Sequence, residues 1–325
     1  MTKKNTGFEI GSDSIKLAAC VDGEVKAMGV RRLPEGLMES GRVTAPSTMV
    51  QIIKDLCSEA GIRGGTCSLV LPRDLVIARK IAMPVVSESE LLLNLPFEFR
   101  DFVGKDMNKY DYDYCVVSVR GNMMELFAAA VEKEAVEAYY SIFRKAGLKL
   151  KAAMPAEMAW LNLIRSSPSE PAKVCVIDVG HTRTRVDIFS DGGFEMGRDI
   201  DIGGQSFDRA IADAQGFDLR TARAHKEDNL DNVLSSDYCT DLFSELSVEV
   251  MKIVNFYRAS TVDGFHLQDL YFSGGSSDIG SLRNAILKRT DMNIHHIRRF
   301  TKAKGIPDDV VMYCALAAGA GLQDH

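Results

Sequence analysis

The feature that most constrains this chain is a stretch of sequence that occurs twice. Residues 8–23 read FEIGSDSIKLAACVDG and residues 177–192 read IDVGHTRTRVDIFSDG, and a constant offset of 169 residues aligns them without a gap. The matched positions share their chemistry: Gly11 with Gly180, Glu9 with Asp178, Lys16 with Arg185, and Asp22-Gly23 with Asp191-Gly192. Two unrelated hairpins with Asp-Gly turns could resemble each other by chance. The shared carboxylates and glycines favour a duplicated unit instead.

Each copy predicts a short strand, a tight turn containing Gly, and an alternating strand closed by Asp-Gly, which is a strong hairpin signal. Apolar strand runs and helical patterns alternate through both halves, which predicts an α/β architecture with two sheets. The segment 166–171 is polar, rich in proline and without period, so it marks the junction of two lobes. We therefore expect a first lobe over 1–167 and a second over 168–325.

Composition excludes several classes of protein. The chain has 325 residues and a formal charge of −6, whereas general binders of nucleic acid or membrane surfaces carry a basic excess. Its longest nearly unbroken apolar stretch, 310–322, is too short to span a bilayer. Glu9 and Asp13 interrupt any signal peptide, and the seven cysteines are scattered without a CxxC pair. We expect a reduced, cytosolic protein.

The glycine-containing turns are candidate phosphate sites. Consecutive backbone N–H groups in a tight turn form a concavity that suits phosphate oxygens, and Ser12 and Ser14 add hydroxyl donors. A carboxylate at the end of the preceding strand, Glu9 or Asp178, could hold water around Mg²⁺. Two such turns would grip a polyphosphate from both sides of a cleft. The alternative is that both are ordinary hairpin turns that use Gly for backbone freedom.

A third element strengthens the phosphate interpretation. The segment 270–277 runs from an apolar strand through Gly274 and Gly275 toward a helix, so a ligand could lie against its backbone. Gly203 and Gly204 form a weaker pair that could be only a sharp turn.

The ordered set of these pieces resembles the actin-like ATPases, and within them the PilM proteins of type IV pilus assembly, which are relatives of FtsA. The resemblance covers nearly the whole chain, and its individual motifs are loose. It is carried by the segments 7–17 (GFEIGSDSIKL), 155–159 (PAEMA), 176–186 (VIDVGHTRTRV), 202–204, 249–257, 270–275 and 315–322.

This resemblance implies two duplicated actin-like, ribonuclease H-like lobes around a nucleotide cleft, with inserted subdomains at about 73–122 and 205–268. It implies ATP and Mg²⁺ as cofactors. It maps the phosphate contacts onto Gly11, Ser12, Asp13, Ser14, Lys16, Gly180, His181 and Thr182. It maps the metal-side carboxylates onto Glu9 and Asp178. It maps the adenosine side onto Gly274, Gly275 and Ser276, with Lys226, Glu249 and Lys252 as weaker candidates. Lys226 lies in a charged segment, so a solvated surface lysine is the alternative there.

Two positions depart from the family pattern. Glu9 stands where the first loop usually carries Asp, and His181 and Arg183 stand where the second loop usually carries small or hydroxyl residues. Arg183 could neutralise a γ-phosphate, or it could pair with Asp199 or Asp201. No residue is identifiable as a base that orients the attacking water, so catalytic residues stay unassigned. The expected activity is at most that of a slow ATPase.

The resemblance implies a cytoplasmic platform that binds the N-terminal tail of a PilN-type inner-membrane protein and connects to the pilus assembly machinery. The chain would then lie at the inner face of the membrane through its partners, without direct membrane insertion, and it could form a homo-oligomer. The tail would bind in a groove beside the first insertion, and the apolar candidates to line it are 91–95, Phe97, Phe99 and Phe102. The alternative is plain core, which helical spacing of such residues more often indicates.

Two other functions fit the same superfamily. A sugar or small-acid kinase would use Asp178 as the carboxylate aimed at a substrate hydroxyl, although no further substrate signature is visible. An FtsA-like membrane anchor would end in an amphipathic helix, whereas this sequence ends four residues after Gly321.

Overall fold

The structure, a computed structural model, describes residues 3–167 and 172–322. Residue contacts divide the chain into two compact units. The first comprises the chain up to Ser166, Lys302–Lys304 and the chain from Leu316 onward; the second comprises Ser167–Thr301 and Gly305–Ala315. Of the segment predicted as the lobe junction, residues 168–171 lie outside the described part.

A five-stranded mixed sheet organises the first unit, in the order β10-β6-β1-β2-β3. Strands β1, β2 and β3 pair antiparallel, and β6 and β10 continue the sheet in parallel with β1. The strands are β1 (Lys4–Ile10), β2 (Ser14–Val21), β3 (Glu24–Arg32), β6 (Gly65–Val70) and β10 (Leu148–Met154). The hairpin predicted from the first repeat copy is confirmed as β1–β2.

The two faces of this sheet are covered differently. On one face Phe8, Ile10, Ile15 and Leu17 form an apolar core with two helices, α1 (Pro46–Glu59) and α4 (Lys133–Lys145). The opposite face carries small residues. A Cβ on Gly7 would lie 1.8 Å from the Ala317 carbonyl oxygen of α10 (Asp308–Gly321), so only glycine permits this close helix packing.

The C-terminal half of α10 also packs against α5 (Ala156–Arg165). A Cβ on Gly319 would lie 2.0 Å from the Ala159 carbonyl oxygen, and the Asn162 side-chain amide donates to the Gly319 carbonyl (3.2 Å). These contacts explain why the last helix is rich in Ala and Gly.

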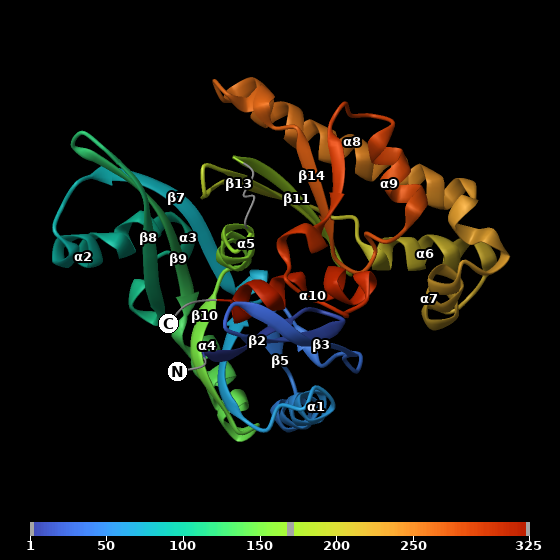
Figure 1. Ribbon diagram of the computed structural model, residues 1–325, viewed down its shortest axis with the longest axis horizontal. Coiled ribbons are helices and arrows are strands. Elements are labelled where there is room, and N and C mark those ends of the chain that lie inside the picture. The colour runs from blue at the N-terminus through green and yellow to red at the C-terminus, as the bar shows by residue number, and fades with distance from the viewer. Residues whose placement is uncertain (1–2, 168–171, 323–325) are drawn as a thin grey trace. The chain divides into compact units, whose positions relative to one another are not determined.

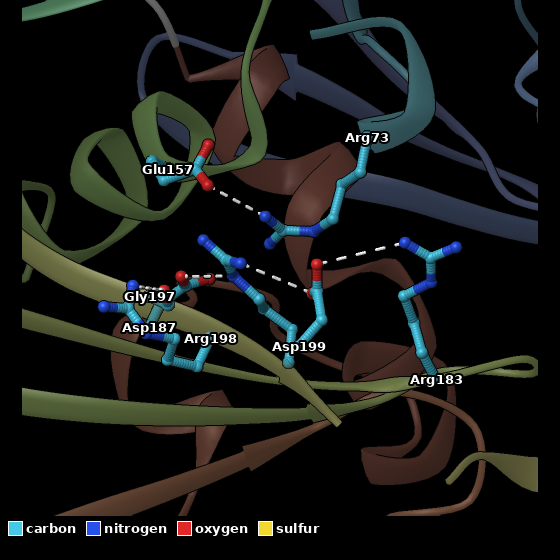
Figure 2. A network of polar contacts seen from close by, with 8 residues as sticks. Arg73, Glu157, Arg183, Asp187, Gly197, Arg198 and Asp199 are labelled. Atoms are coloured by element: carbon cyan, nitrogen blue, oxygen red, sulfur yellow. Dashed lines mark hydrogen bonds and ion pairs between the residues drawn. The ribbon is translucent and has the colours of Figure 1, made fainter. Parts of the chain in front are cut away.

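A separate three-stranded antiparallel sheet, β7-β9-β8, is inserted between β6 and α4 (Figure 1). Its elements are η1 (Arg73–Leu75), β7 (Val76–Pro84), α2 (Glu88–Glu98), α3 (Arg100–Val103), η2 (Met107–Lys109), β8 (Tyr110–Arg120) and β9 (Met123–Glu132). A capping box is present at the start of α2, where Ser87 and Glu90 cap each other. Arg73 donates to the buried Glu157 of α5 (2.8 Å), which ties the start of the insertion to the first unit (Figure 2). A short hairpin, β4 (Met38–Glu39) and β5 (Arg42–Val43), precedes α1.

The second unit contains a five-stranded sheet in the order β13-β12-β11-β14-β15. One face is apolar and is covered by α6, α8 and α9, which supply Phe207, Phe243 and Leu282 among other core residues (Figure 1). The strands are β11 (Lys173–Val179), β12 (Thr184–Ser190), β13 (Gly193–Ile200), β14 (Asp269–Ser273) and β15 (Asn293–His296). The helices are α6 (Gly204–Gln215), α7 (Leu219–Asp228), η3 (Leu230–Ser235), α8 (Asp237–Ser260), η4 (Gly264–His266), α9 (Gly280–Leu287) and η5 (Ile297–Phe300).

The duplication inferred from the sequence holds at the level of topology. In both units three antiparallel strands come first, a fourth strand pairs in parallel with the first of them, and a fifth pairs in parallel with the fourth. Even the turns agree, because Asp22-Gly23 has φ values of 50° and 77° and Asp191-Gly192 has 51° and 72°. Positive φ at both central residues is typical of a type I′ hairpin turn. The α/β fold prediction with two sheets is confirmed.

Within residues 3–167 and 172–322, every helix is too short or too polar to cross a lipid bilayer.

Candidate functional site

In the first unit the predicted phosphate loop is a tight turn between β1 and β2. The Gly11 N–H donates to the Ser14 carbonyl (2.9 Å), and the Leu33 N–H donates to the Asp13 carbonyl (2.8 Å), which anchors the turn to the end of β3. Ser12 lies in the same turn. A Cβ on Gly11 would lie 3.2 Å from Lys16 Nζ, so the ammonium group sits directly over the turn. This arrangement suits an anion.

Glu9 and Lys16 form an ion pair beside this turn. The two residues are directly opposite in the β1–β2 register, and Lys16 Nζ lies 2.8 Å from Glu9 Oε1. Both side chains are largely shielded from solvent. The Glu9 carboxylate is therefore already balanced by a cation, and a metal ion at Glu9 would compete with Lys16.

The second unit contains the matching loop, from Gly180 to Arg183. The Gly180 N–H donates to the Arg183 carbonyl (3.0 Å), as Gly11 does to Ser14 in the first copy. The start of α6 braces this loop, since the Gly204 N–H donates to the Gly180 carbonyl (2.9 Å) and the Gln205 N–H to the His181 carbonyl (2.7 Å). A Cβ on Gly203 would lie 2.6 Å from the backbone nitrogen of Arg183. The pair Gly203-Gly204 is thus more than a sharp turn, because it lets two backbone segments pack directly.

Lys226 is buried at this loop, so the surface-lysine alternative is wrong. Its side chain is 9% exposed, and its Nζ donates to the Gly204 carbonyl (2.9 Å) and lies 2.6 Å from Asp208 Oδ1. Burial lowers the pKa of Lys226, and the charge of Asp208 opposes that shift. Arg223, one turn earlier on α7, donates to Asp208 Oδ2 (3.3 Å), and its Nη2 lies 3.1 Å from His181 Nδ1. A charged network therefore connects α6 and α7 to the loop.

The segment after β14 closes the same region. A Cβ on Gly204 would lie 2.7 Å from Ser276 Oγ, and the Ser276 N–H donates to the Val179 carbonyl (3.3 Å). Gly274 has φ +88°, and a Cβ there would lie 2.7 Å from Asp178 Oδ1. The structure thus brings together Asp178, Gly180, His181, Thr182, Gly274, Ser276 and Lys226 at the ends of β11 and β14.

Gly275 has a different environment. A Cβ there would lie 2.5 Å from Cε1 of Tyr313, so the ring of Tyr313 covers this glycine. The absence of a side chain at Gly275 therefore allows the Tyr313 ring to pack against the backbone.

Glu249 and Lys252 lie elsewhere. They pair with each other on α8 (2.6 Å) and line an open groove of about 680 Å³ between α8 and the edge strand β13. None of the loop residues from 180–182, 274–276 or position 226 lines this groove. The structure does not group these two residues with the other adenosine-side candidates.

The chemistry of the carboxylates sets a limit on metal binding. Among the residues that the structure describes, no cluster of three or more His, Cys, Asp or Glu side chains could hold a metal ion. Mg²⁺ normally keeps several waters and takes only one or two protein carboxylates. A site that uses Asp178 as its carboxylate fits that requirement.

Sequence reasoning missed Asp208 and Arg223. Arg223 and Lys226 are three residues apart on α7, so they share a helix face, which the sequence could have shown. Nothing local indicates that this face is buried against Asp208 of another helix.

Comparisons with known proteins agree with this architecture. The family model described as type IV pilus assembly protein PilM matches residues 7–310. A structure titled PilM-PilN type IV pilus biogenesis complex superposes with a TM-score of 0.83 at 22% identity, covering 98% of each chain. The ethanolamine utilization protein EutJ from Carboxydothermus hydrogenoformans gives a TM-score of 0.64 at 12% identity over 99% of this chain and 89% of that one. MreB 5 of Spiroplasma citri bound to AMPPNP gives 0.56 at 12% identity over 98% and 95%.

Proposed function

Because the chain belongs to the type IV pilus assembly protein PilM family, we propose that it binds a magnesium-bound adenine nucleotide and holds the tail of a PilN-type inner-membrane protein. Such a protein is a platform, in which nucleotide occupancy and partner binding meet in one chain. Binding the tail would place it at the inner face of the cytoplasmic membrane, in contact with the rest of the pilus assembly machinery.

The observation that carries the nucleotide proposal is the gathering of loop residues in the second unit. The turn at Gly180, the Ser276 hydroxyl and the buried Lys226 meet around Gly204, and Gly274 in the turn before Ser276 lies against the Asp178 carboxylate. Backbone turns with a nearby cation and carboxylate suit a phosphate chain with its metal. Support also comes from relatives of the same fold, since MreB 5 of Spiroplasma citri is described with ADP and with AMPPNP.

Specific residues would hold the nucleotide. Asp178 would accept hydrogen bonds from metal-bound water, and the loops from Gly180 to Thr182 and from Gly11 to Ser14 would take phosphate oxygens. Lys16 lies over Gly11 and is paired with Glu9. When the nucleotide binds, Lys16 would leave Glu9 and balance the charge of a phosphate group. The magnesium ion would supply further neutralisation of the phosphates.

The partner proposal rests on the exposed apolar surface of the insertion. Eight of the sixteen large hydrophobic residues that are exposed in the described chain lie between Val85 and Met123. Four of them, Leu92, Leu93, Phe97 and Phe102, come from α2 and α3. We call these four the insertion patch. A concentrated apolar surface of this kind is typical of a protein-binding site.

This assignment corrects the sequence-based groove residues. Leu91, Leu95 and Phe99 are buried in the core of the insertion against β7 and β9, so they cannot contact a partner directly. The patch of Leu92, Leu93, Phe97 and Phe102 is what remains available. The family resemblance and the complex described as PilM-PilN support a PilN-type tail as its occupant.

The partner proposal is tested by fluorescence anisotropy with a labelled PilN-type tail peptide. We expect saturable binding of the peptide. The double variant Leu93→Ala and Phe97→Ala should bind it roughly tenfold or more weakly, because each substitution removes an apolar contact that the peptide would bury. Tyr140→Ala on α4 is a matched control, since Tyr140 is similarly exposed outside the insertion. Unchanged affinity in the double variant would remove the insertion patch from the proposal.

The nucleotide proposal is tested by displacement of a fluorescent ATP analogue with unlabelled ATP in the presence of MgCl₂. Formation of ADP is measured in parallel with and without added sugars or small organic acids. We expect displacement by ATP and no stimulation of ADP formation. Stimulation by a sugar or acid would favour the kinase alternative.

A further inference from the structure

A row of charged residues crosses three strands of the second sheet on one face. Asp178 on β11 lies directly opposite Arg185 on β12, which lies directly opposite Asp199 on β13. Thr184, between Arg183 and Arg185, is fully buried and donates its hydroxyl to the Ile202 carbonyl (2.7 Å). Because side chains alternate along a strand, the two arginines lie on the face opposite Thr184. Both pair with Asp199 there, and Figure 2 shows the pair between Arg183 and Asp199.

Arg185 is fixed in place. Its Nε donates to Asp187 Oδ1 (2.7 Å), and the Asp187 side chain is only 1% exposed. Opposite Asp187 stands Gly197, where a Cβ would lie 2.1 Å from Arg185 Nη2. The missing side chain makes room for the guanidinium. Its Nη1 then lies 3.4 Å from Asp199 Oδ1, so Asp199 keeps one cationic partner whatever Arg183 does.

The ion pair between Arg183 and Asp199 is longer and more exposed. Its Nη1 lies 3.9 Å from Asp199 Oδ2, and the two side chains are 38% and 35% exposed. An exposed ion pair at this distance contributes little to stability. Of the links in the chain Asp187–Arg185–Asp199–Arg183, the last is therefore the one that another anion can replace most readily.

Arg183 also closes the candidate phosphate loop, because its carbonyl accepts the hydrogen bond from the Gly180 N–H. A guanidinium presents a planar pair of donors that matches phosphate oxygens. We propose that Arg183 is the residue by which this loop distinguishes a nucleoside triphosphate from a diphosphate. On binding of the triphosphate, its guanidinium leaves Asp199 for the terminal phosphate. This inference rests on the proposed nucleotide function and names a determinant of its specificity.

The test is calorimetric titration of the whole chain with ATP and with ADP, both with MgCl₂. The variants are Arg183→Gln, Asp199→Asn and the control Arg198→Gln. Arg198 is a neighbouring exposed arginine whose guanidinium donates to the Gly197 carbonyl, so its loss changes the net charge equally. We expect wild type and the control to bind ATP more tightly than ADP. Arg183→Gln should weaken ATP binding by about tenfold and ADP binding little, because one charge-assisted contact is lost.

Asp199→Asn removes the competing carboxylate, so we expect it to keep or increase the preference for ATP. An unchanged preference in Arg183→Gln would overturn the inference while leaving the proposed function standing. A lost preference in Asp199→Asn would overturn it too, since Asp199 would then be the discriminating group. If neither nucleotide binds to wild type, the proposed function fails and the inference fails with it.

Discussion

Glu9 lies directly opposite Lys16 across β1 and β2, with Lys16 Nζ 2.8 Å from Glu9 Oε1. The second repeat copy places Asp178 opposite Arg185 in the same way. In that copy the arginine pairs with Asp187 and Asp199. The two copies thus keep the same charges at the same sheet positions, while their ion pairs differ.

We predict that Lys16→Met weakens ATP binding by about tenfold, because a charge-assisted contact to phosphate is lost. Glu9→Gln should weaken it less, since the charge of Glu9 is already balanced by Lys16 and the substitution releases that lysine for the ligand. Titration of both variants with ATP and MgCl₂ measures the difference. A larger loss in Glu9→Gln would show that Glu9 itself serves the metal.

The buried pair of Lys226 and Asp208 should be important for stability. Lys226→Met leaves the carboxylate of Asp208 buried with only Arg223 beside it, and breaking a buried pair in this way costs roughly 3 kcal/mol. Urea denaturation compares the free energy of unfolding with that of wild type. Lys252→Met is the matched control, because Lys252 is an exposed lysine paired on α8. Equal stability of Lys226→Met and wild type would contradict the burial of this network.

Substitutions of Phe97 and Phe99 should differ greatly in their effect on stability, although the two residues are close in sequence. Phe99 is fully buried in the insertion core, so Phe99→Ala should lower the free energy of unfolding by about 3–5 kcal/mol. Phe97 is 59% exposed, and Phe97→Ala should change stability by less than about 0.5 kcal/mol. Thermal and urea denaturation of the two variants give this comparison. Similar losses in both would mean that the insertion patch is part of the core.

His296 should make the protein sensitive to mild acid. Burial lowers the pKa of His296 below 6.5, with Arg298 adding to this effect and Asp308 opposing it. Its Nδ1 accepts a hydrogen bond from the Arg298 N–H (2.9 Å), which requires that nitrogen to be unprotonated. The unfolded chain binds the proton more tightly, so stability falls as pH drops through 6.5 and the loss is complete below the folded-state pKa.

The measurement for His296 is the free energy of unfolding at pH 7.5 and pH 5.5. His296→Asn, whose amide oxygen can replace the Nδ1 acceptor, should lose less stability between these pH values than wild type does. An equal loss in both proteins would assign the acid sensitivity to other groups.

Local sequence signals predicted the repeated hairpins well. Asp-Gly turns and alternating apolar residues determine this structure almost by themselves, and the capping box at Ser87 likewise depends on residues three apart. The buried stripe of α2 and α3 could also have been found, since Leu91, Leu95 and Phe99 recur every four residues. The sequence interpretation instead weighed the whole apolar run together, as groove lining or as core, without dividing it into a buried face and an exposed face.

The remaining features depend on a turn that the sequence does not mark and on contacts between distant segments. The helix expected after Gly274 and Gly275 begins only at Gly280, because the Ser277 hydroxyl first donates to the Gly274 carbonyl (2.6 Å) in a turn. The burial of Lys226 depends on Asp208, which belongs to another helix. No local pattern contains that information.

The central claim is that Asp178 and the loop after β11 bind a magnesium-bound nucleotide. Calorimetric titration of wild type, Asp178→Ala and Glu137→Ala with ATP and MgCl₂ tests it most directly, with the exposed Glu137 of α4 as the control for loss of one carboxylate. We predict that wild type binds ATP at one saturable site. The affinity should fall by about tenfold or more in Asp178→Ala, because a charged ligand of the metal shell is lost, and should be unchanged in Glu137→Ala. Equal binding by wild type and Asp178→Ala, or no binding by wild type, would contradict the account.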